Sequence, residues 1–356
     1  MARGHGLRVG LAALAAGLAV LALGLELSGY EAGRALAALW SGAFGSWYAF
    51  SSATLVRAVP LIIIGLGLAL AFRAGAFNIG GEGQFYAGAI AATWLGLHAA
   101  ALPSLVAVPV VLAGATLAGA LWVAVPVLLR VRFGVIEVIS TLLLNFVAEA
   151  LTSLVVQGPL QESQRIYPQS DAIAQAARLP VLSGTRLHAG LLLAVLGALL
   201  LHRLFTRTLW GFRLRAVGLG PRAAETVGRI DSRRTAAAAL ALSGAIAGLA
   251  GGVEVAGVSY ALFQNLSPGY GFTAIAVALL GRLHPLGVVA AGILFGALEA
   301  GAGAMQREAG VPAVAVYVVE AVVILAVLLA ESARRHGPAA LASIGTGVRA
   351  AGPARW

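Results

Sequence analysis

Long apolar stretches dominate this chain, and their length constrains the fold more than any other feature of the sequence. The hydrocarbon core of a bilayer is about 30 Å thick, and a helix of roughly 20 residues crosses it. Of the 356 residues, 60% are hydrophobic and only 11% are charged. Because backbone polar groups inside lipid need partners within their own segment, helices are the expected spanning elements. The sequence therefore predicts an all-α, polytopic membrane bundle.

About ten segments are candidate transmembrane helices. They are residues 7–27, 58–72, 84–98, 104–129, 135–156, 189–205, 236–258, 271–281, 286–304 and 312–330. The first segment could instead be a signal peptide, but no good A-x-A cleavage site follows it. We expect residues 1–335 to form a single transmembrane domain and residues 336–356 to form a basic cytoplasmic tail.

The distribution of arginine supports this topology. All 24 basic residues are Arg, and the formal net charge is +10. If the N-terminus is cytoplasmic, 18 arginines fall on the cytoplasmic side and 6 on the outer side, as the positive-inside rule requires. The C-terminus is then cytoplasmic too, with an inner loop at about 203–235 and an outer loop at about 157–188. The basic surplus is a topology signal, so nucleic-acid binding is not expected.

Two missing residue types exclude several functions. Without Cys there are no disulfides, thiolate zinc sites or Cys nucleophiles, and without Lys the chain cannot form a Walker A phosphate loop. No spaced Asp-rich metal motif is present, and the six His residues fall near span ends or in tails. An intramembrane enzyme is therefore a weak alternative.

Two predicted spans are too short to cross a bilayer. Residues 58–72 make about 22 Å of helix and residues 271–280 about 15 Å. Short or interrupted segments in membrane proteins border a cavity or are buried in protein, and they mark substrate pathways in transporters. The stretch FNIGGEGQFYAG, residues 77–88, fits such a break because Gly80, Gly81 and Gly83 permit it.

Acidic and amide side chains accompany this break. Glu82 could cap the helix that starts near Gln84, pair with Arg73, or contact a polar solute. In residues 135–156, Glu137 and Asn145 lie on or beside one polar helical stripe. Asn145 could bond a neighbouring helix or face a solute.

Repeated glycines predict close helix packing. Gly244, Gly248 and Gly252 recur every four residues, and Gly292 and Gly296 share that spacing. The same glycines could also serve a moving gate, which spacing alone does not show.

The two long loops suggest contacts outside the membrane. In the inner loop, Gly220 and Pro221 read as a helix stop followed by a start, which predicts a short helix over 221–230. That helix could dock a soluble partner or simply be part of a solvated basic loop. The outer loop could cover the outer mouth or receive a delivery protein.

Four blocks in this order resemble the permease subunits of ABC importers for nucleosides and simple sugars. These importers belong to the wider monosaccharide and branched-chain amino-acid permease superfamily. The blocks are FRAGAFNIGGEGQFYAGA, FGVIEVISTLLLNF, RAVGLGPRAAETVGRIDSRR running into ALSGAIAGLAGG, and GYGFTAIAVALLGRLHPLGVVAAGILFGALEAG. The resemblance covers about residues 50–330 and favours the branch linked to basic-membrane lipoproteins.

The resemblance implies a division of labour. An extracytoplasmic binding lipoprotein delivers the nucleoside or sugar, this chain and a second, paralogous permease form the pathway, and a cytoplasmic ABC ATPase drives transport. The chain would sit in the lipid of a bacterial or archaeal cytoplasmic membrane. It would not be an enzyme and would bind no cofactor or metal, since ATP and Mg belong to the ATPase.

The resemblance also suggests roles for single residues. It makes the short inner helix the coupler to the ATPase, with the residues Pro221, Arg222, Ala224, Glu225 and Gly228. For the solute pathway, hydroxyl contacts are assigned to Asn78, Gln84, Glu137 and Asn145, and base contacts to Phe85, Tyr86 and Phe272. Glu82 is a further pathway candidate.

Two alternative transporters remain open. In an ion- or proton-coupled secondary transporter, Glu82, Glu137 and Glu254 would be the coupling groups. An ABC permease for branched-chain amino acids is the other alternative.

Overall fold

The computed structural model describes residues 17, 19–226, 228–312, 317–318 and 321. The chain divides into two compact units, one of Ala43–Ala300 and one of Met1–Gly42 with Gly301–Trp356. Within the described residues the structure is helical, with only two isolated β-bridges, Gln169 to Phe263 and Val181 to His188. This confirms the all-α prediction.

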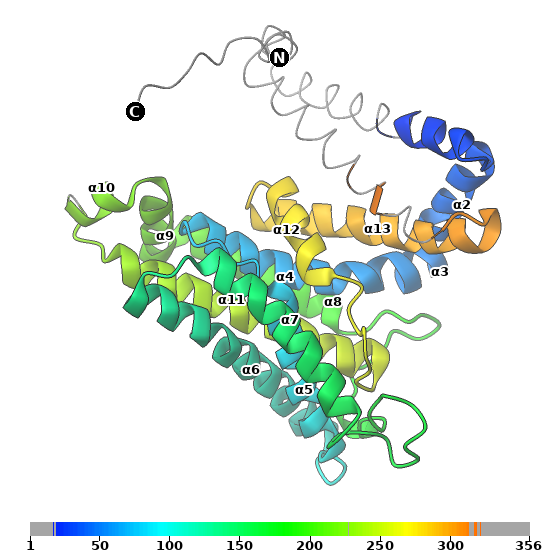
Figure 1. Ribbon diagram of the computed structural model, residues 1–356, viewed down its shortest axis with the longest axis horizontal. Helices are drawn as coiled ribbons and strands as arrows, with labels where there is room; N and C mark the ends of the chain where they lie inside the picture. The colour runs from blue at the N-terminus through cyan, green and yellow to red at the C-terminus, as the bar shows by residue number, and fades with distance from the viewer. Residues whose placement is uncertain (1–16, 18, 227, 313–316, 319–320, 322–356) are drawn as a thin grey trace, which may run out of the picture. The chain divides into compact units, whose positions relative to one another are not determined.

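The larger unit contains most of the helices (Figure 1). Its elements are α3 (Trp47–Ala49), η1 (Phe50–Leu55), α4 (Val56–Arg73), α5 (Gly81–Leu97), α6 (Ser104–Phe133), α7 (Glu137–Val156), η2 (Gln175–Ala177), α8 (Gly190–Arg207), α9 (Leu209–Leu219), α10 (Pro221–Thr226), α11 (Ser232–Glu254), η3 (Val255–Ser259) and α12 (Tyr270–Leu280). Two further helices, α2 (Ala32–Phe44) and α13 (Pro285–Ala309), run across the boundaries of the units.

The smaller unit begins with a helical segment, residues 19–27, that is followed by the start of α2. The side chain of Glu26 accepts a hydrogen bond from the backbone N–H of Ala32 at 2.9 Å. In the last part of α13, a Cβ on Gly301 would lie 2.8 Å from Cγ of Leu39, so only glycine fits this approach.

Six helices in the described part of the chain are long and apolar enough to cross a bilayer, and α12 is a shorter apolar helix. The predicted spans at 84–98, 104–129, 135–156, 189–205, 236–258, 271–281 and 286–304 each coincide with a helix of the structure. Most of 7–27 and 312–330 lies outside the described residues, as does the 336–356 tail. The count of about ten spans is therefore not confirmed.

The prediction that residues 58–72 are too short to span was wrong. In the structure, α3, η1 and α4 join into one helix of 27 residues from Trp47 to Arg73. The sequence Phe50–Leu55 adopts a π-helix, which carries the helical path across polar residues such as Ser51 and Ser52. The hydroxyl of Ser51 bonds the Trp47 carbonyl at 2.7 Å, so these serines need no water and do not end the helix. The short length of α12 is confirmed, at 11 residues.

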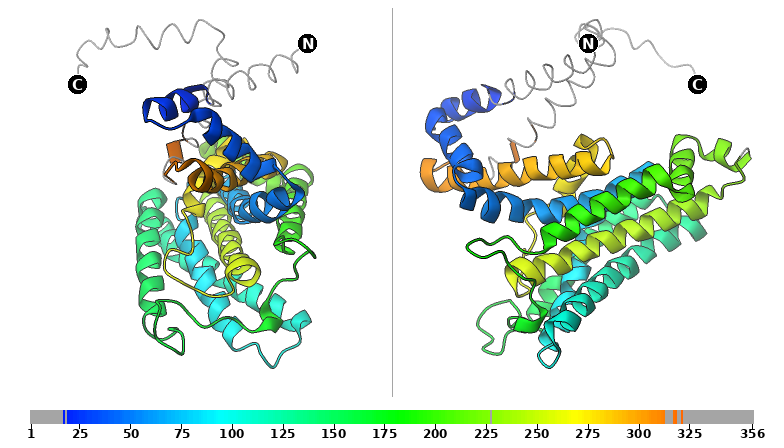
Figure 2. Two further views of the ribbon diagram at one scale, coloured as in Figure 1. Left: turned by 90° about the vertical axis from the view of Figure 1, so that its right-hand side faces the viewer. Right: turned by 180° about the vertical axis from the view of Figure 1, so that it is seen from behind.

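The core of the larger unit lies around α11, which packs against α4, α5 and α6. Figures 1 and 2 show α4, α11 and α6 running side by side. A Cβ on Gly248 would lie 2.7 Å from Cα of Gly119, and one on Gly252 would lie 2.5 Å from Cβ of Ala115. The predicted close packing through small residues is therefore confirmed for α11.

Gly292 and Gly296 also lie where helices approach closely. A Cβ on Gly296 would lie 2.8 Å from the backbone nitrogen of Ala58, and one on Gly292 would collide with the side chain of Ile62. These glycines bring α13 against α4 within the larger unit, which confirms the packing prediction for this pair as well.

The larger unit has two distinct ends (Figure 1). One carries the largely irregular segment 157–189, which we call the loop end, and the other carries α9 and α10, which we call the α9–α10 end. The predicted inner loop at 203–235 is thus more structured than expected, because α9 occupies residues 209–219. Its start is fixed by Thr208, whose hydroxyl accepts from the N–H of Gly211 at 3.1 Å.

Candidate functional site

The chain breaks between α4 and α5, at residues 74–80. The predicted break within 77–88 is therefore confirmed only in its first part, because Gly81 and Gly83 lie in the first turn of α5. After Arg73, Gly75 adopts φ +69°, a conformation that L side chains rarely take, and the chain turns away from the axis of α4. Residues 76–80 then run without regular secondary structure before α5 starts at Gly81. Ala74, Ala76, Asn78 and Gly80 of this break are buried, so their backbone groups need partners within the protein.

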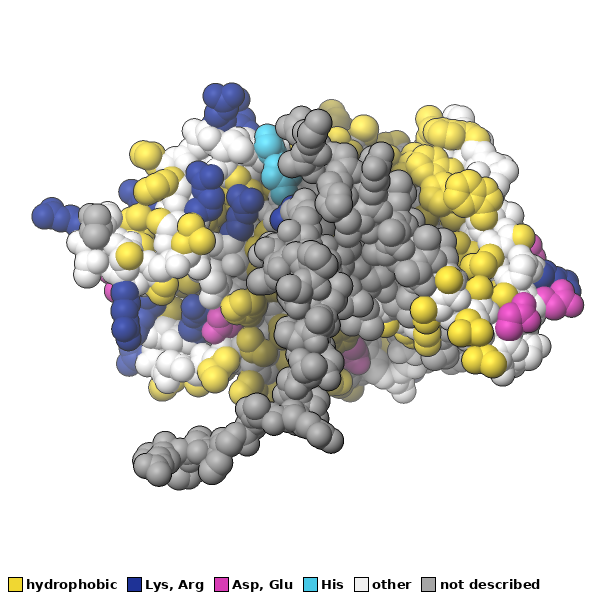
Figure 3. Space-filling model, turned by 90° about the horizontal axis from the view of Figure 1, so that it is seen from above, with side chains coloured by type: hydrophobic (Ala, Val, Ile, Leu, Met, Phe, Trp, Pro, Cys, Tyr) yellow, Lys and Arg dark blue, Asp and Glu magenta, His cyan; other side chains and the backbone are white. Residues whose placement is uncertain are grey.

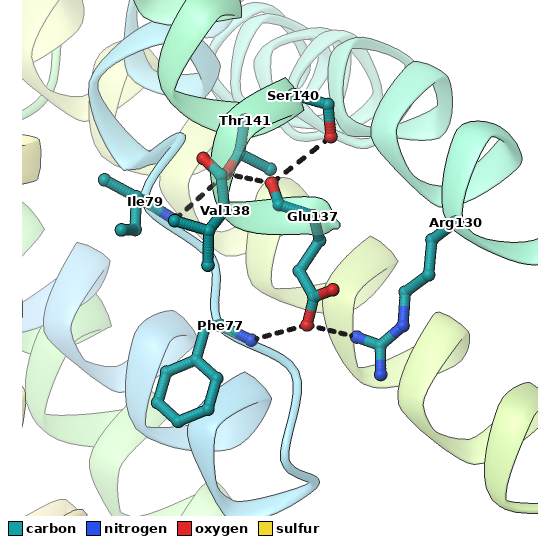
Figure 4. Close-up of polar contacts among 7 residues, drawn as sticks. All are labelled: Phe77, Ile79, Arg130, Glu137, Val138, Ser140 and Thr141. Atoms are coloured by element: carbon teal, nitrogen blue, oxygen red, sulfur yellow. Dashed lines mark hydrogen bonds and ion pairs between the residues drawn. The ribbon is translucent and has the colours of Figure 1, made fainter. Parts of the chain in front are cut away.

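The first group of partners comes from the start of α7 (Figure 4). The Glu137 carboxylate accepts from the backbone N–H of Phe77 at 3.2 Å, and the same oxygen pairs with the Arg130 guanidinium at 2.6 Å. One turn further on, the hydroxyl of Thr141 accepts from the N–H of Ile79 at 3.2 Å. Figure 4 shows these side chains pointing from α6 and α7 toward the broken segment.

The second group centres on Asn145, which is fully buried. Its carbonyl oxygen accepts from the N–H of Gly83 at 2.9 Å, and its amide nitrogen donates to the carbonyl of Ile79 at 2.9 Å. A single side chain of α7 thus satisfies a backbone donor of α5 and a backbone acceptor of the break. Interhelical bonding, one of the two readings left open for Asn145, is what the structure has.

The third group lies on the other side of the break. Asn78 and Gln84 face one another through two hydrogen bonds of 2.8 and 2.9 Å between their amide groups. The Asn78 amide also donates to the hydroxyl of Ser243 on α11 at 2.9 Å, and its oxygen accepts from the N–H of Gly80 at 2.9 Å. Both amides are buried, so this cluster replaces the helical bonds that the break removes.

Four of the residues predicted to contact solute hydroxyls therefore lie together around the break. They are Asn78, Gln84, Glu137 and Asn145. All four are buried, and each makes hydrogen bonds within the protein: Asn78, Glu137 and Asn145 bond backbone groups, and Gln84 bonds the side chain of Asn78. Their role as solute contacts stays a prediction, while their role in stabilising an irregular backbone is a direct observation.

Glu82 connects α5 with α12. Its carboxylate accepts from the N–H of Gly271 at 2.6 Å, and a Cβ on Gly271 would lie 2.6 Å from Cα of Glu82. Pairing with Arg73, one of the alternatives left open for Glu82, is not what the structure has: the Arg73 guanidinium lies over the ring of Phe205, 4.3 Å from its centroid. This hydrogen bond joins the first turns of two helices, where the helix dipoles favour a negative charge. It therefore offsets part of the free-energy cost of burying the carboxylate.

The predicted aromatic contacts differ in exposure. Phe85 is fully buried and packs edge-on against Tyr270, with ring centroids 5.9 Å apart. Tyr86 is also buried, and its hydroxyl accepts from the N–H of Ser267 at 3.2 Å. Of these three aromatic residues, only Phe272 is exposed, at 41% of its surface.

The coupling segment is shorter than predicted. Helix α10 covers Pro221–Thr226, and Gly228 lies in the turn that follows, where the N–H of Ile230 bonds the carbonyl of Ala224 at 3.0 Å. Ala224 packs with Val217 and Ile230 in a small apolar cluster. The residues Pro221, Arg222, Glu225 and Gly228 are exposed, and the Glu225 carboxylate accepts from the hydroxyl of Ser232.

A cavity of about 470 Å³ separates the coupling segment from the chain break. The break borders it through Ala74 and Gly75, helix α9 through Val217 and Gly218, and α10 through Pro221. A Cβ on Gly218 would lie 3.4 Å from the backbone nitrogen of Gly75 and would collide with the carbonyl oxygen of Arg73. Helix α9 thus touches the end of α4 backbone to backbone.

Exposed arginines surround the α9–α10 end of the larger unit (Figure 3). All eight from Arg203 to Arg234 are exposed. They make this end strongly basic, in agreement with the positive-inside assignment of the inner loop. The histidines that lie close to each other are His202 and His284, with ring centroids 5.2 Å apart, and burial lowers the pKa of His284.

No three His, Asp or Glu side chains gather in a metal-binding arrangement in the part of the chain that the structure describes. Sequence reasoning missed the partners Ser243 and Arg130. Arg130 could have been found, since Gly134 at φ +68° ends α6 and turns the chain back so that residues 130 and 137 face each other. Nothing in the sequence around Ser243 indicated its contact with a break 165 residues away.

Comparison with known proteins identifies a family. Residues 50–328 match the family model described as the branched-chain amino acid transport system permease component. No solved structure matches the chain.

Three relatives cover most of the chain. The glucose ABC transporter permease protein TsgB13 of Haloferax volcanii is 40% identical over 79% of this chain and 77% of its own length. The guanosine ABC transporter permease protein NupP of Bacillus subtilis is 38% identical over 90% of this chain and 92% of its own. The nucleoside ABC transporter permease protein NupB of Lactococcus lactis is 34% identical, over 76% and 77%.

Proposed function

The chain belongs to the permease-component family of branched-chain amino acid transport systems, and we propose that its substrate is a nucleoside. As a member of this family it is a non-catalytic membrane subunit of an ABC importer, and a separate ATPase hydrolyses ATP. Its relatives are ABC permeases, so neither ion-coupled secondary transport nor an enzyme activity is favoured.

The observation that carries the nucleoside proposal is the match to NupP, which extends over 90% of this chain. The match to TsgB13 has slightly higher identity but covers less of the chain, at 79%. A sugar ring with vicinal hydroxyls is common to a nucleoside and to glucose. A simple sugar is therefore the second candidate substrate, whereas no relative described above carries a branched-chain amino acid in its name.

The partners follow from the same family. We infer a cytoplasmic ATPase, an extracytoplasmic binding lipoprotein and a second permease. Bacillus subtilis and Lactococcus lactis each have another, less similar relative, NupQ at 30% and NupC at 29% identity, which supports a paralogous second permease. The chain itself binds no cofactor in this proposal, since ATP and Mg are held by the ATPase.

The basic α9–α10 end is assigned to the cytoplasm because of its eight exposed arginines. The loop end is then extracytoplasmic, where the lipoprotein would deliver the solute to residues 157–189. If the predicted spans at 7–27 and 312–330 also cross, both chain termini would lie in the cytoplasm, in a bacterial or archaeal cytoplasmic membrane with lipid around the apolar helices. We do not expect this assembly to bind nucleic acid.

A route from the ATPase to the pathway can be traced through contacts of the described residues. The ATPase would dock on α10, whose exposed Arg222 and Glu225 offer contacts and whose buried Ala224 packs on Val217 of α9. Helix α9 meets the end of α4 where Gly218 touches the backbone of Arg73. A displacement of α10 would therefore reach the chain break at 74–80, and with it the start of α5.

The direct test is reconstitution of this chain with its ATPase, second permease and lipoprotein in liposomes. ATP-dependent uptake of radiolabelled guanosine is expected, with no uptake when the lipoprotein or ATP is omitted. Uptake of glucose but not guanosine would refute the nucleoside assignment. Guanosine uptake without the ATPase would refute the ABC mechanism.

A second test addresses docking. Replacement of Glu225 or Gly228 should lower uptake and solute-stimulated ATP hydrolysis together, because both residues lie in or beside α10. Normal coupling in both variants would remove α10 as the docking element.

A further inference from the structure

One buried carboxylate in the larger unit lacks a direct partner. Glu254 is the last residue of α11 and is only 6% exposed. Among the described residues, no hydrogen bond or ion pair reaches its carboxylate. A buried carboxylate without a hydrogen bond costs free energy, so its retention in an apolar bundle calls for a function.

The charges that face Glu254 come from two other elements. Arg57 lies in the first turn of α4, and Arg186 lies in the loop segment 157–189; both are close enough to interact with Glu254 electrostatically. Tyr270, in the first turn of α12, lies close enough to Glu254 and Arg57 to interact with both electrostatically. Elements far apart in sequence thus converge on one carboxylate near the loop end.

Both long helices at this place depart from α-helical geometry. The π-helix η1 immediately precedes the turn that carries Arg57, and the π-helix η3 immediately follows Glu254. Single π turns within long helices occur frequently at functional sites, because they widen the helix and redirect a side chain. Here one π turn flanks each of the two opposite charges.

The loop segment 157–189 is attached to both π-helices. The N–H of Leu179 donates to the carbonyl of Ala256 in η3 at 2.8 Å, and the N–H of Arg186 donates to the hydroxyl of Ser52 in η1 at 3.0 Å. Anything that binds this loop from outside would therefore act on the two helical turns beside Glu254 and Arg57.

We propose that Glu254, flanked by Arg57 and Arg186, is a contact site for the vicinal hydroxyls of the solute's sugar ring near the loop end of the permease. A carboxylate can accept hydrogen bonds from two neighbouring hydroxyls, and guanidinium groups can donate to their oxygens. In the structure Glu254 is buried and Arg186 is exposed, so a solute would reach Glu254 by displacement of the attached loop or the π turns. The inference rests on the proposed function, because it assumes a solute with a sugar ring.

This site differs from the cluster around the chain break. Asn78, Gln84 and Asn145 have all their side-chain amide groups engaged by the protein, so a solute would have to displace existing bonds. Glu254 has no such bond to lose. A solute hydroxyl arriving there gains a charge-assisted hydrogen bond without breaking one within the protein.

The experiment compares two solutes in the reconstituted importer, each with wild-type and Glu254→Gln permease. Guanosine has the vicinal 2′ and 3′ hydroxyls, and 2′,3′-dideoxyguanosine lacks them. Since a hydrogen bond to a charged group contributes roughly 1.5–3 kcal/mol, we expect guanosine uptake to fall about 10-fold or more. Dideoxyguanosine uptake should change less than about 3-fold, because that solute never makes the bond.

For each solute, uptake by the variant is divided by uptake by the wild type. The lipoprotein is the same in every experiment, so its own selectivity cancels when these two ratios are compared. Glu308→Gln, which changes an exposed acid in the last turn of α13, is the matched control and should leave both uptake rates unchanged. An equal fall in the uptake of both solutes by Glu254→Gln, or no fall for either, would overturn the proposal.

A second variant covers the case in which Glu254→Gln does not assemble. Glu254→Asp keeps the charge but withdraws it by one methylene, so it should again lower guanosine uptake more than dideoxyguanosine uptake. If neither variant assembles with the ATPase, Glu254 has a structural role and the proposal is wrong. Failure of the wild-type importer to take up guanosine would instead refute the nucleoside function itself.

Discussion

Removal of the Asn145 side chain should destabilise the protein more than any change on the exposed faces of α7. The amide of Asn145 holds the N–H of Gly83 and the carbonyl of Ile79, each at 2.9 Å. In Asn145→Ala both backbone groups lose their partner. Water cannot easily replace it, because Asn145 and Gly83 are buried.

The size of the effect follows from these two groups. A buried backbone group without a partner costs about 1–3 kcal/mol. Gly83 is fully inside the bundle, whereas Ile79 is partly exposed, so its carbonyl should contribute at the low end of that range. The expected loss of unfolding free energy for Asn145→Ala is therefore about 2–4 kcal/mol.

The measurement is reversible unfolding in mixed micelles, followed by tryptophan fluorescence. Trp122 is a suitable reporter because its indole nitrogen lies 3.0 Å from where a Cβ on Gly83 would be. The matched control is Gln157→Ala at the other end of α7, where the side chain is exposed and bonds only Ser153 at 2.8 Å. That variant should lose less than about 0.5 kcal/mol.

A loss for Asn145→Ala no larger than that of Gln157→Ala would refute the reasoning. The Asn145 amide would then be dispensable to the fold. Combined with reduced uptake, such a result would return this residue to the role of solute contact that its sequence position suggests.

Three further predictions address coupling, pH and packing. Gly218→Ala should reduce uptake per assembled complex at least several-fold, because its Cβ would press on the end of α4; Gly220→Ala, with the nearest atom at 3.7 Å, should not, and equal uptake would refute the coupling route. Burial lowers the pKa of His188 in the loop to about 4 from 6.5, so below pH 6.5 the unfolded chain binds a proton that the folded chain does not. Stability should therefore be constant above pH 6.5 and fall by up to about 3 kcal/mol toward pH 4; an unchanged pH slope in His188→Phe would contradict this. Gly248→Ala should cost about 1–3 kcal/mol of unfolding free energy by overpacking α11 against α6, and Gly197→Ala, with only ordinary contacts, is its control.

The helices that could be predicted from sequence are those whose apolar length is unambiguous. Helices α6, α7 and α8 begin and end within a few residues of their predicted spans, because charged or turn-forming residues border each apolar run. The error at 58–72 has a physical cause. The hydroxyls of Ser51, Ser52 and Thr54, which precede this span, bond backbone carbonyls of the preceding segment or one another, so these polar residues do not end the helix.

The candidate site shows a different limit. That the chain breaks near residue 80 was predictable, because glycines and amides interrupt an apolar run, although the break lies at 74–80 and residues 81–88 are helical. Which side chain would satisfy which backbone group was not, because Ser243 and Thr141 reach the break from helices whose packing the local sequence does not encode. The sequence thus indicates that these polar residues lie at the break, but not that Glu137, Thr141 and Asn145 bond its backbone groups.

Two irregular segments are both held by α5, and the first of them is the break at 74–80. The second runs from Tyr260 to Gly269, with Tyr260 and Asn265 both at φ +57°. It is held to α5 by the Tyr86 hydroxyl on the N–H of Ser267, and the carboxylate of Glu82 holds the next helix by the N–H of Gly271.

Because the first turns of α5 carry partners for both segments, α5 cannot shift along its axis without moving both. The break at 74–80 meets the coupling helices through Gly218, while the segment at 260–269 follows the π turn beside Glu254. A displacement of the α9–α10 end can thus be transmitted through α5 to the loop end. An importer needs such a connection, since the ATPase acts on the cytoplasmic face of the membrane and the solute is delivered to the outer face.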